Sequence, residues 1–467
     1  MLERLLQPLS RAAIARSVRR QRASKLQDPA LWGARVDEGG GLEIDRVGLA
    51  RVMEEYGSPV FLVSRSKLVA DVGEIVRACA SFDPPVRAFY SYKTNGVPEL
   101  VKQIHEMGPG AEVISPYELW LARRQGLCGD SIVYNGVNKS DESLRLAVSA
   151  DVLAINADEP EEIDRIAAAA DELRRPARVG LRLRLLPGSH FGLGVFDGQL
   201  EAGVEKLRRQ PRLELSSLHF HLVAAARNSS RHRELTLRAL RCLREVEGRL
   251  GRRVPYLNLG GGFGVPTTAV MSRSQYAAHR LFEAPPAPPD PEDHQDFASY
   301  LGDLVSAVNG FDDSRPPALI IEPGRVAVSR SQTLLSRVHS IKPNPREPHY
   351  ALTDAGRVLV SYPCDYEYHQ IFVANRMREP LTTRYHLMGR LCTSADWLAK
   401  NRILPRLSPG DTIAVMDAGA YFFSYSTNFA FPRPPVVMAA EGETKMLRRG
   451  ETFEHLCAMD AQGIAHG

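Results

Sequence analysis

Short apolar runs alternate with stretches of helical periodicity over much of this chain. The runs at 60–63 and 152–155 contain only apolar residues, and segments with helical spacing follow them at 66–80 and 159–173. The second of these helices begins with acidic residues, and Arg174 and Arg175 follow its end, as the helix dipole favours. Repeated alternation of strands and helices predicts a parallel sheet with crossover helices.

The number of strand–helix units indicates how this sheet closes. About eight units favour a closed (β/α)₈ barrel of the TIM type over an open sheet, and we place this barrel at residues 58–330. Its further strands are expected at 88–92, 131–134, 179–185, 215–220, 256–259 and 318–321, with helices at 98–107 and 116–125.

The pattern changes beyond about residue 330. Apolar runs become shorter and richer in β-branched residues, and turn sequences such as Ser408-Pro409-Gly410-Asp411 separate them. We therefore expect a second, mainly β domain over residues 331–467. The proline-rich stretch 283–291 can form neither a helix nor a central strand, so we expect it to leave the barrel as an exposed excursion.

Residues 1–25 form a separate basic extension. Seven Arg or Lys side chains face a single acid, Glu3, and several leucines lie near helical spacing. Such a segment is typical of an organelle transit peptide, of a membrane-surface helix, or of a surface helix packed on the body of the protein or on a partner subunit. We favour the packed surface helix. The extension has no continuous apolar region, so we do not expect a secretory signal.

Composition narrows the functional classes. The chain has 467 residues, of which 44% are hydrophobic and 24% charged, as in ordinary soluble proteins. A formal net charge of +4 gives no support for a nucleic-acid partner. The six cysteines are scattered without metal spacing, which favours a reducing, cytoplasmic location without disulfides. No apolar run approaches the roughly 20 residues that span a bilayer, so we expect no membrane span.

A lysine closes one of the predicted strands. Lys93 follows the run Tyr90-Ser91-Tyr92 and precedes polar, helix-starting residues. This position puts its amine at the C-terminal end of a barrel strand, where barrel enzymes hold their chemistry. A buried amine without a carboxylate is costly, so such a lysine usually has a covalent or ionic role, although most strand-end lysines are simply solvated.

Two histidines close another strand. His219 and His221 lie two residues apart at the end of the strand 215–220, so they would point to the same side and could serve a metal. No acidic or cysteine partner with metal spacing accompanies them in the sequence. We therefore expect no metal site.

Two further strand ends carry residues suited to an anion. The glycines 260–262 allow backbone amides to approach an anion closely, as in a phosphate nest, or else form a tight turn without a ligand. Glu322 and Arg325 flank Pro323-Gly324 and could hold a cationic ring nitrogen and a phosphate from one loop. A surface acid–arginine pair is the alternative.

Together these residues resemble the fold-type III, pyridoxal-phosphate-dependent decarboxylases of the ornithine and diaminopimelate decarboxylase group, over about residues 45–440. The segment Tyr90–Asn95 is similar to the family motif Y-A-x-K-A-N, which implies that Lys93 holds pyridoxal 5'-phosphate as a Schiff base. The resemblance implies decarboxylation of an amino acid or derivative to CO₂ and an amine, by a homodimer with shared active sites. It also implies that residues 26–57 contribute to the β domain.

The resemblance assigns roles to the other site residues. Glu322 would keep the pyridine nitrogen protonated, so that the ring accepts the electrons released with CO₂. His221 would stack on the ring, and Cys392 from the second subunit, or Lys93, would reprotonate the α-carbon. The further cofactor contacts that it implies are Glu112, Arg182, Gly260, Gly261, Gly262, Gly324, Arg325 and Tyr421.

Two positions depart from the family pattern. Ala224 stands where family members usually have a serine that contacts the phosphate. Thr393 follows Cys392 where ornithine and diaminopimelate decarboxylases place an acid that meets the distal amine of a diamino substrate. We therefore doubt ornithine, lysine or diaminopimelate as the substrate, and a modified or tethered amino acid is as plausible. The tentative substrate contacts are Asp365, Glu367, Thr393 and Asp396, of which the first two could replace the missing acid.

Two other functions stay open. An amino-acid racemase could use the same cofactor and barrel, but alanine-type racemases avoid an acid on the ring nitrogen, and Glu322 is an acid. A non-catalytic homologue that binds pyridoxal phosphate would explain Ala224 and Thr393. Retention of Lys93 and Cys392 counts against this second alternative.

Overall fold

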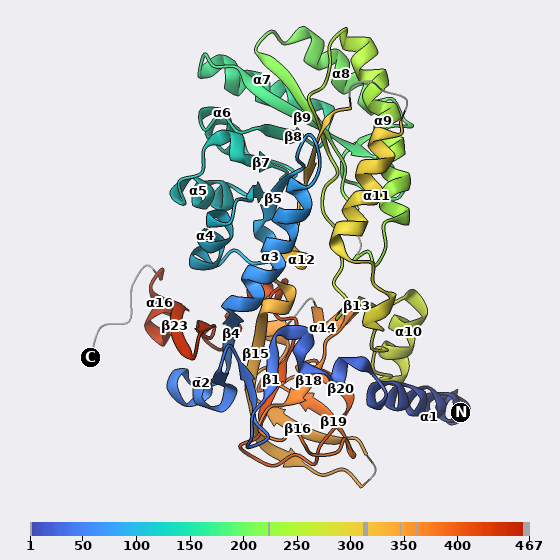
Figure 1. The fold of residues 1–467 in the computed structure, drawn as a ribbon, viewed down its shortest axis with the longest axis vertical. Coiled ribbons are helices and arrows are strands. Elements are labelled where there is room, and N and C mark those ends of the chain that lie inside the picture. The colour runs from blue at the N-terminus through green and yellow to red at the C-terminus, as the bar shows by residue number, and fades with distance from the viewer. Residues whose placement is uncertain (1, 223–224, 312–315, 346, 361–362, 461–467) are drawn as a thin grey trace. The chain divides into compact units, whose positions relative to one another are not determined.

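The computed structural model describes residues 2–222, 225–311, 316–345, 347–360 and 363–460. The chain divides into two compact units, and both are discontinuous in sequence (Figure 1). The barrel unit comprises Val72–Phe263 and Gln295–Ala327. The β unit comprises Met1–Asp71, Gly264–His294 and Val328–Gly467.

Eight parallel strands close the barrel. They follow one another in the order β9-β11-β12-β14-β5-β6-β7-β8, and a pairing between β8 and β9 completes the circle. The predicted closed barrel is therefore confirmed. The strands are β5 (Arg87–Ser91), β6 (Gly110–Val113), β7 (Ile132–Tyr134), β8 (Ala154–Ala157), β9 (Ala177–Arg184), β11 (Leu213–His219), β12 (Tyr256–Asn258) and β14 (Ala318–Ile321).

Helices connect these strands and surround them (Figure 1). Local signals fix where several of them begin: a proline occupies the first turn of α4, α5 and α7, and the Ser115 and Ser140 hydroxyls cap α5 and α6. The helices of this unit are α4 (Pro98–Glu106), α5 (Pro116–Arg124), α6 (Asp141–Ser149), α7 (Pro160–Glu172), α8 (Gln199–Arg209), α9 (Ser230–Leu250) and α11 (Phe297–Asn309), and α3 (Arg65–Ala80) leads into it.

The first expected barrel strand belongs to the other unit. β4 (Val60–Ser64) pairs antiparallel with β15 (Gln332–Lys342) and parallel with β22 (Val436–Ala440). The boundary of the barrel unit therefore differs from the expected residue 58, and the first barrel strand is β5. An apolar run of this length fits the interior of either sheet, so its pattern alone does not identify its partners.

The β unit is built on a mixed sheet, as the expected second domain required. Its main path runs β20-β19-β16-β15-β4-β22-β23, and β21 joins β15 to β18. Trp32 and Leu49 from the N-terminal segment share one apolar core with Leu335 and Val437. The other strands are β16 (His349–Thr353), β18 (Ile371–Val373), β19 (Thr383–Met388), β20 (Trp397–Leu404), β21 (Thr412–Val415) and β23 (Glu443–Arg448).

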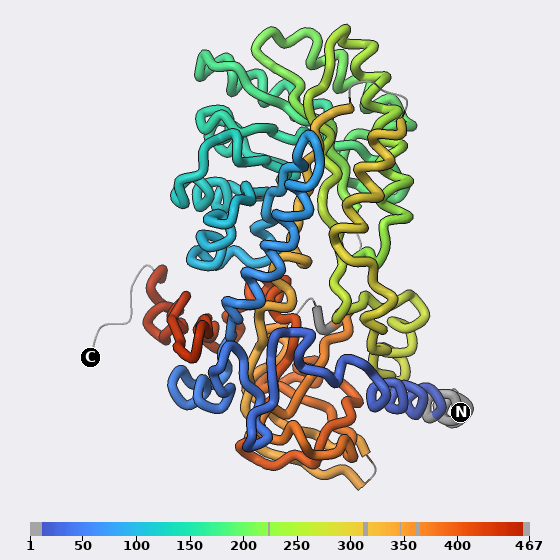
Figure 2. Tube along the Cα trace, in the orientation of Figure 1, coloured from blue at the N-terminus to red at the C-terminus, as the bar shows by residue number. Residues whose placement is uncertain are grey.

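The basic N-terminal extension is a helix packed on the β unit. Helix α1 (Leu2–Arg22) contacts β20 and α10 (Arg273–Phe282), and Figure 2 shows α1 and α10 side by side. The Ser17 hydroxyl donates a hydrogen bond to the Pro285 carbonyl, and Lys25 pairs with Asp290 at 3.2 Å. The extension (residues 1–25) and the proline-rich stretch (residues 283–291) are therefore joined by a hydrogen bond and an ion pair. This is the packing that the surface-helix interpretation predicted. The side chains of residues 2–11 lie outside this description.

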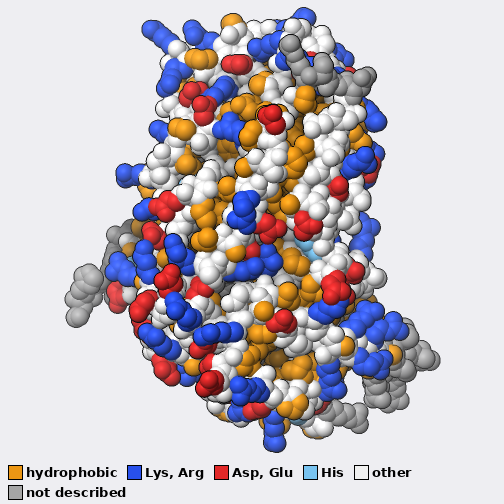
Figure 3. All heavy atoms as spheres, in the orientation of Figure 1, with side chains coloured by type: hydrophobic (Ala, Val, Ile, Leu, Met, Phe, Trp, Pro, Cys, Tyr) orange, Lys and Arg blue, Asp and Glu red, His pale blue; other side chains and the backbone are white. Residues whose placement is uncertain are grey.

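Two global properties bear on the partners of the chain. None of the helices in the described ranges combines the length and apolar character needed to cross a membrane. Lys and Arg side chains are mixed with Asp and Glu side chains over the face drawn in Figure 3. That face carries no extended surface of one sign, as nucleic-acid binding would need.

Candidate active site

Lys93 lies at the C-terminal end of the barrel strands, as its sequence position predicted. It belongs to a 3₁₀ turn (Tyr92–Thr94) that directly follows β5. Its Nζ lies 2.6 Å from Oε2 of Glu112, a fully buried residue on β6. The lysine side chain itself remains 30% exposed. The Glu112 carboxylate therefore balances the charge of the Lys93 amine, and the lysine side chain stays partly accessible to solvent.

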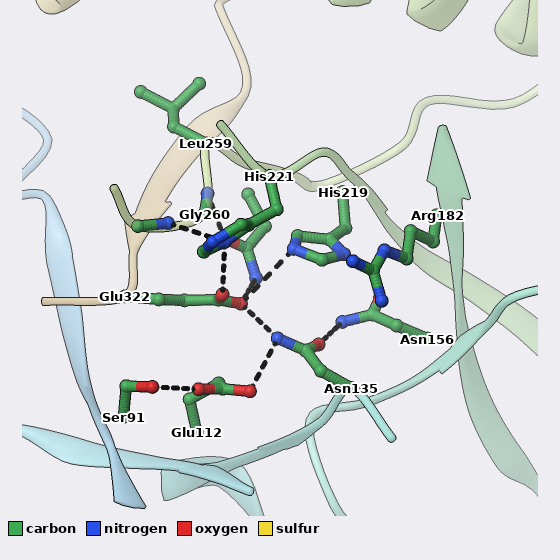
Figure 4. A network of polar contacts seen from close by, with 12 residues as sticks. Ser91, Glu112, Asn135, Asn156, Arg182, His219, His221, Leu259, Gly260 and Glu322 are labelled. Atoms are coloured by element: carbon green, nitrogen blue, oxygen red, sulfur yellow. Dashed lines mark hydrogen bonds and ion pairs between the residues drawn. The ribbon is translucent and has the colours of Figure 1, made fainter. Parts of the chain in front are cut away.

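Asn135 connects Glu112 to a second buried acid, Glu322 (Figure 4). The Asn135 amide donates to Oε1 of Glu112 at 3.1 Å and to Oε1 of Glu322 at 2.7 Å. Its own carbonyl oxygen accepts a hydrogen bond from Asn156. The ends of β6, β7, β8 and β14 thus meet in one hydrogen-bonded network that begins at Lys93.

Glu322 has one oxygen fully engaged and one oxygen without a hydrogen bond. Oε1 also accepts from the Asn258 amide at 2.7 Å. Oε2 is buried, lies 3.9 Å from Nδ1 of His221, and has no hydrogen-bond partner among the described residues. Burial opposes ionisation of Glu322, but His219, His221 and Lys93 outweigh it and hold its pKa well below the usual range. A buried, ionised oxygen without a donor fits a cationic N–H such as that of a protonated pyridine ring.

The two histidines differ in environment. His219 is buried, its Nε2 lies 3.5 Å from Oε1 of Glu322, and burial lowers its pKa. His221 is more exposed, and its Nδ1 accepts a hydrogen bond from the Gly261 amide at 3.2 Å. This bond fixes the plane of the His221 ring above the glycine turn, as a ring that stacks on a flat cofactor requires.

The fold brings an acid to the histidines, which the sequence did not reveal. Ligand atoms of His219, His221 and Glu322 lie within 4.8 Å of one another, a spacing that could also hold a metal ion. Two features oppose that interpretation. Oε1 of Glu322 already accepts two amide hydrogen bonds, and Nδ1 of His221 already accepts one. Lone pairs that already accept amide hydrogen bonds are less available to a metal ion.

The glycine turn after β12 permits close packing around Glu322. A Cβ on Gly261 would come within 2.5 Å of the Glu322 carbonyl oxygen and 3.3 Å of Cε1 of His221. A Cβ on Gly324 would collide with the Thr94 hydroxyl. Larger residues at these positions would push the Lys93 turn and the Glu322 loop apart.

The remaining residues expected at the cofactor lie on neighbouring barrel elements. Arg182, on β9, has its guanidinium 4.9 Å from the Phe191 ring centre and 3.5 Å from Asp158. Arg325 begins the short helix α12 (Arg325–Val328) and is partly buried. Ala224, the expected departure in the phosphate site, lies outside the described residues.

Cys392, which is expected to come from a second subunit, belongs to the β unit, as do the expected site residues Thr393, Asp396 and Tyr421. Cys392 and Thr393 are exposed on the turn before β20, and Tyr421 precedes helix α15 (Phe422–Tyr425) in a left-handed conformation. Asp396 is buried under this turn, where its two oxygens accept the Arg357 and Leu391 amides at 2.7 and 2.6 Å. Its carboxylate therefore shapes the turn that presents Cys392.

The two acids that could replace the missing substrate acid already have partners. Asp365 forms a bidentate pair with Arg357, and Glu367 is buried 3.2 Å from Nε2 of His369. Asp365 would have to leave the Arg357 guanidinium, and Glu367 the His369 ring, to meet a substrate amine.

Sequence reasoning missed the asparagines of the network. Asn135, Asn156 and Asn258 are neutral amides at the ends of apolar strands and carry no spacing signal. Their position directly at or after a barrel strand was the one feature that could have identified them.

Comparisons with known proteins identify the family of this chain. The family model described as "Pyridoxal-dependent decarboxylase, pyridoxal binding domain" matches residues 69–329. The diaminopimelate decarboxylase of Aquifex aeolicus is 27% identical, covering 89% of this chain and 95% of its own. That of Methanothermobacter thermautotrophicus is 28% identical, covering 90% and 96%. A crystal structure of diaminopimelate decarboxylase from M. jannaschii in complex with L-lysine has a TM-score of 0.80 at 25% identity, covering 91% and 97%.

Proposed function

This chain belongs to the pyridoxal-dependent decarboxylases, and we propose that Lys93 and Glu322 carry the reaction on its amino-acid substrate. The family's cofactor is pyridoxal 5'-phosphate, and its reaction releases an amino-acid carboxylate as CO₂ and leaves an amine. The observation that carries the assignment is Oε2 of Glu322, an ionised, buried oxygen that has no hydrogen-bond donor.

Each residue of the barrel site has a distinct task in this proposal. The cofactor, when bound, supplies an electron-accepting ring that takes up the electron pair released with CO₂. Lys93 would bind it covalently, and Glu112 positions the lysine amine at 2.6 Å. Oε2 of Glu322 would keep the ring nitrogen protonated, while Asn135 and Asn258 hold Oε1. Arg182, Arg325 and the glycine turn are the proposed cofactor contacts around them.

We propose that a homodimer completes the site, with Cys392 of one copy donating a proton at the barrel of the other. Exposed aromatic side chains on the barrel unit support this proposal: Tyr117 and Trp120 are 58% and 52% exposed and stack on each other at 6.1 Å. Apolar surface of this kind is typical of protein interfaces. The cysteines at 79, 128, 242, 392 and 457 are free, which supports a reducing, cytoplasmic setting.

The substrate proposal follows from Thr393, Asp365 and Glu367. The relatives are diaminopimelate decarboxylases, and one was solved with L-lysine. In this chain a neutral Thr393 follows the cysteine, and the two nearby acids are paired with Arg357 and His369. We therefore propose a substrate whose side chain does not end in a free ammonium group, such as a modified or tethered amino acid.

The test combines absorption spectra with CO₂ release. Purified protein with pyridoxal 5'-phosphate is titrated with L- and D-amino acids and with their side-chain-acylated derivatives, as wild type, Lys93→Ala and Lys102→Ala. Lys102 is an exposed lysine on α4 and controls for nonspecific reaction with the cofactor. We expect a visible band that needs Lys93 but not Lys102 and that changes as CO₂ appears.

The other outcomes separate the alternatives. A band that does not depend on Lys93 would refute the assignment of that lysine. Interconversion of L- and D-forms without CO₂ would indicate a racemase. A Lys93-dependent band that no amino acid or derivative changes would indicate a non-catalytic homologue.

A further inference from the structure

A lysine and a glutamate form a buried ion pair in the barrel unit that the proposed reaction does not use. Lys139 lies between β7 and α6, and Glu162 lies on α7; their side chains are 0% and 2% exposed. Nζ of Lys139 donates to both Glu162 oxygens at 3.1 Å and to the Asn156 backbone carbonyl at 2.8 Å. The ammonium group thus has three acceptors, one for each of its protons.

A buried ion pair of this kind contributes little to stability by itself. The cost of removing both charges from water largely cancels their attraction. Apolar side chains of similar volume can often replace such a pair without loss of stability. The other contacts of Lys139 and Glu162 therefore indicate what the pair does in this barrel.

Glu162 holds the loop that follows β8. Its Oε2 also accepts a hydrogen bond from the Asp158 backbone amide at 2.9 Å. The Asp158 carboxylate in turn accepts the Gly192 amide at 3.0 Å and lies 3.5 Å from Nη1 of Arg182. A continuous series of polar contacts thus leads from α7 through this loop to Arg182.

Arg182 is the point at which these contacts reach the candidate active site. Figure 4 shows its guanidinium pointing toward the His219 ring. The guanidinium contacts Asp158 on one hand and the Phe191 ring, at 4.9 Å from its centre, on the other. A displacement of Asp158 would therefore change where the Arg182 charge lies.

We propose that Lys139 and Glu162 are positioning residues for the cofactor site and act on Arg182 through Asp158. This inference rests on the proposed function, because it takes Arg182 as a cofactor contact. Lys139 fixes the Glu162 carboxylate and the end of β8, and Glu162 fixes the backbone of Asp158. The Asp158 carboxylate then holds Arg182 in place.

Two double variants test this role, because both remove the ammonium group and they differ at the Asp158 amide. In Lys139→Met/Glu162→Gln the glutamine carbonyl oxygen can still accept that amide. In Lys139→Met/Glu162→Leu nothing replaces the lost acceptor. We expect the dissociation constant of pyridoxal 5'-phosphate, measured by titration of the Lys93-dependent absorption band, to be about ten times higher in the leucine variant than in the glutamine variant.

Hydrogen exchange of the cofactor-free protein measures the positioning without the cofactor. The amides of residues 189–194 should exchange faster in the leucine variant than in the glutamine variant, because the acceptor of Gly192 is no longer fixed. Asp158→Ala removes this acceptor directly, so it should show both effects and covers the case in which the double variants do not fold. Asp164→Asn, which breaks an exposed pair with Lys206 on the same helix, should change neither property.

Equal dissociation constants in the two double variants would overturn the proposal, as would wild-type affinity and exchange in Asp158→Ala. A wild-type protein without a Lys93-dependent band would instead refute the proposed function. The exchange rates would then still decide whether the Lys139–Glu162 pair fixes the Asp158 loop.

Discussion

Asn135 ties Glu112 to Glu322, and its replacement by leucine tests how the site is held together. The amide lies 3.1 Å from Oε1 of Glu112 and 2.7 Å from Oε1 of Glu322. Leucine has a similar shape but no donor, so each carboxylate loses one hydrogen bond. Both losses occur in the buried interior of the barrel.

The expected loss in the free energy of unfolding follows from the hydrogen bonds that are lost and those that remain. A hydrogen bond to a charged group contributes roughly 1.5–3 kcal/mol, so the two bonds lost by the carboxylates cost about 3–6 kcal/mol. The Asn156 amide also loses its neutral acceptor, which adds roughly 0.5–1.5 kcal/mol. Asn258 still donates to Glu322, and Lys93 still donates to Glu112. We therefore expect Asn135→Leu to lower the free energy of unfolding by about 3.5 kcal/mol at pH 7, the lower end of the summed range.

The stability loss caused by Asn135→Leu should also depend on pH, in a direction that follows from the pKa of Glu322. The pKa of Glu322 lies well below the usual range, so its ionisation contributes stability above about pH 4.5 that is lost as the pH falls through the folded-state value. Asn135 favours the ionised form, and its removal should raise that pKa. The deficit of Asn135→Leu should therefore be largest at neutral pH and smaller in acid.

Urea unfolding of the cofactor-free protein at pH 7 and at the lowest pH at which the protein stays folded measures this deficit. Asn309→Leu, at the exposed end of α11, controls for the introduction of a leucine. A loss below about 1 kcal/mol, the value of one ordinary hydrogen bond, would contradict the network. A loss that is equal at both pH values would show that Asn135 acts by packing and not through the carboxylates.

Three further predictions address other parts of the molecule. Cys392→Ala should keep the cofactor bound, as its absorption band reports, while product formation slows or is diverted; loss of the cofactor would make Cys392 structural. Burial raises the pKa of Glu118 to about 7, so wild-type stability should fall between pH 4.5 and 7 by up to about 3 kcal/mol, and Glu118→Gln should flatten this part of a pH–denaturation series. An unchanged slope would refute that pKa assignment. Asp417 accepts hydrogen bonds from Trp32 at 2.8 Å and Thr267 at 2.7 Å inside the β unit, so Asp417→Ala should lower its thermal midpoint by more than 5 °C, whereas Asp417→Asn, which keeps one acceptor, should cost less. Equal effects of the two variants would show that the hydrogen bonds contribute little.

The barrel could be predicted from the sequence because its strands and helices alternate in a regular order. The expected strands at 88–92 and 318–321 match β5 and β14 closely. β4 could not be placed, because five buried positions in a row are compatible with any sheet interior. Its partners are selected by contacts with segments several hundred residues away, which no local pattern encodes.

The candidate site also contains residues that could be predicted from the sequence and residues that could not. Lys93 and Glu322 follow strands and carry charge, so their positions were predicted from the sequence pattern and the family motif. The acid beside His219 and His221 could not be predicted, because Glu322 is about a hundred residues away in the sequence and meets them only when the barrel closes. The amides of Asn135 and Asn258 belong to the site because they donate hydrogen bonds to carboxylates from other strands, Glu112 and Glu322. A sequence pattern does not show such contacts.

The position of β4 also has a consequence for synthesis of the chain on the ribosome. β4 emerges early, but β15 and β22, the strands that flank it, are made only after the whole barrel sequence has been translated. Until then, a strand of four apolar residues and Ser64 has unpaired backbone groups that can pair with incorrect partners. The barrel unit can fold first. The β unit then completes its sheet when β15 and β22 pair with β4, which was synthesised long before them. Truncation before Val436 should therefore leave β4 without one of its two neighbours and produce an aggregating chain, however well the barrel itself has folded.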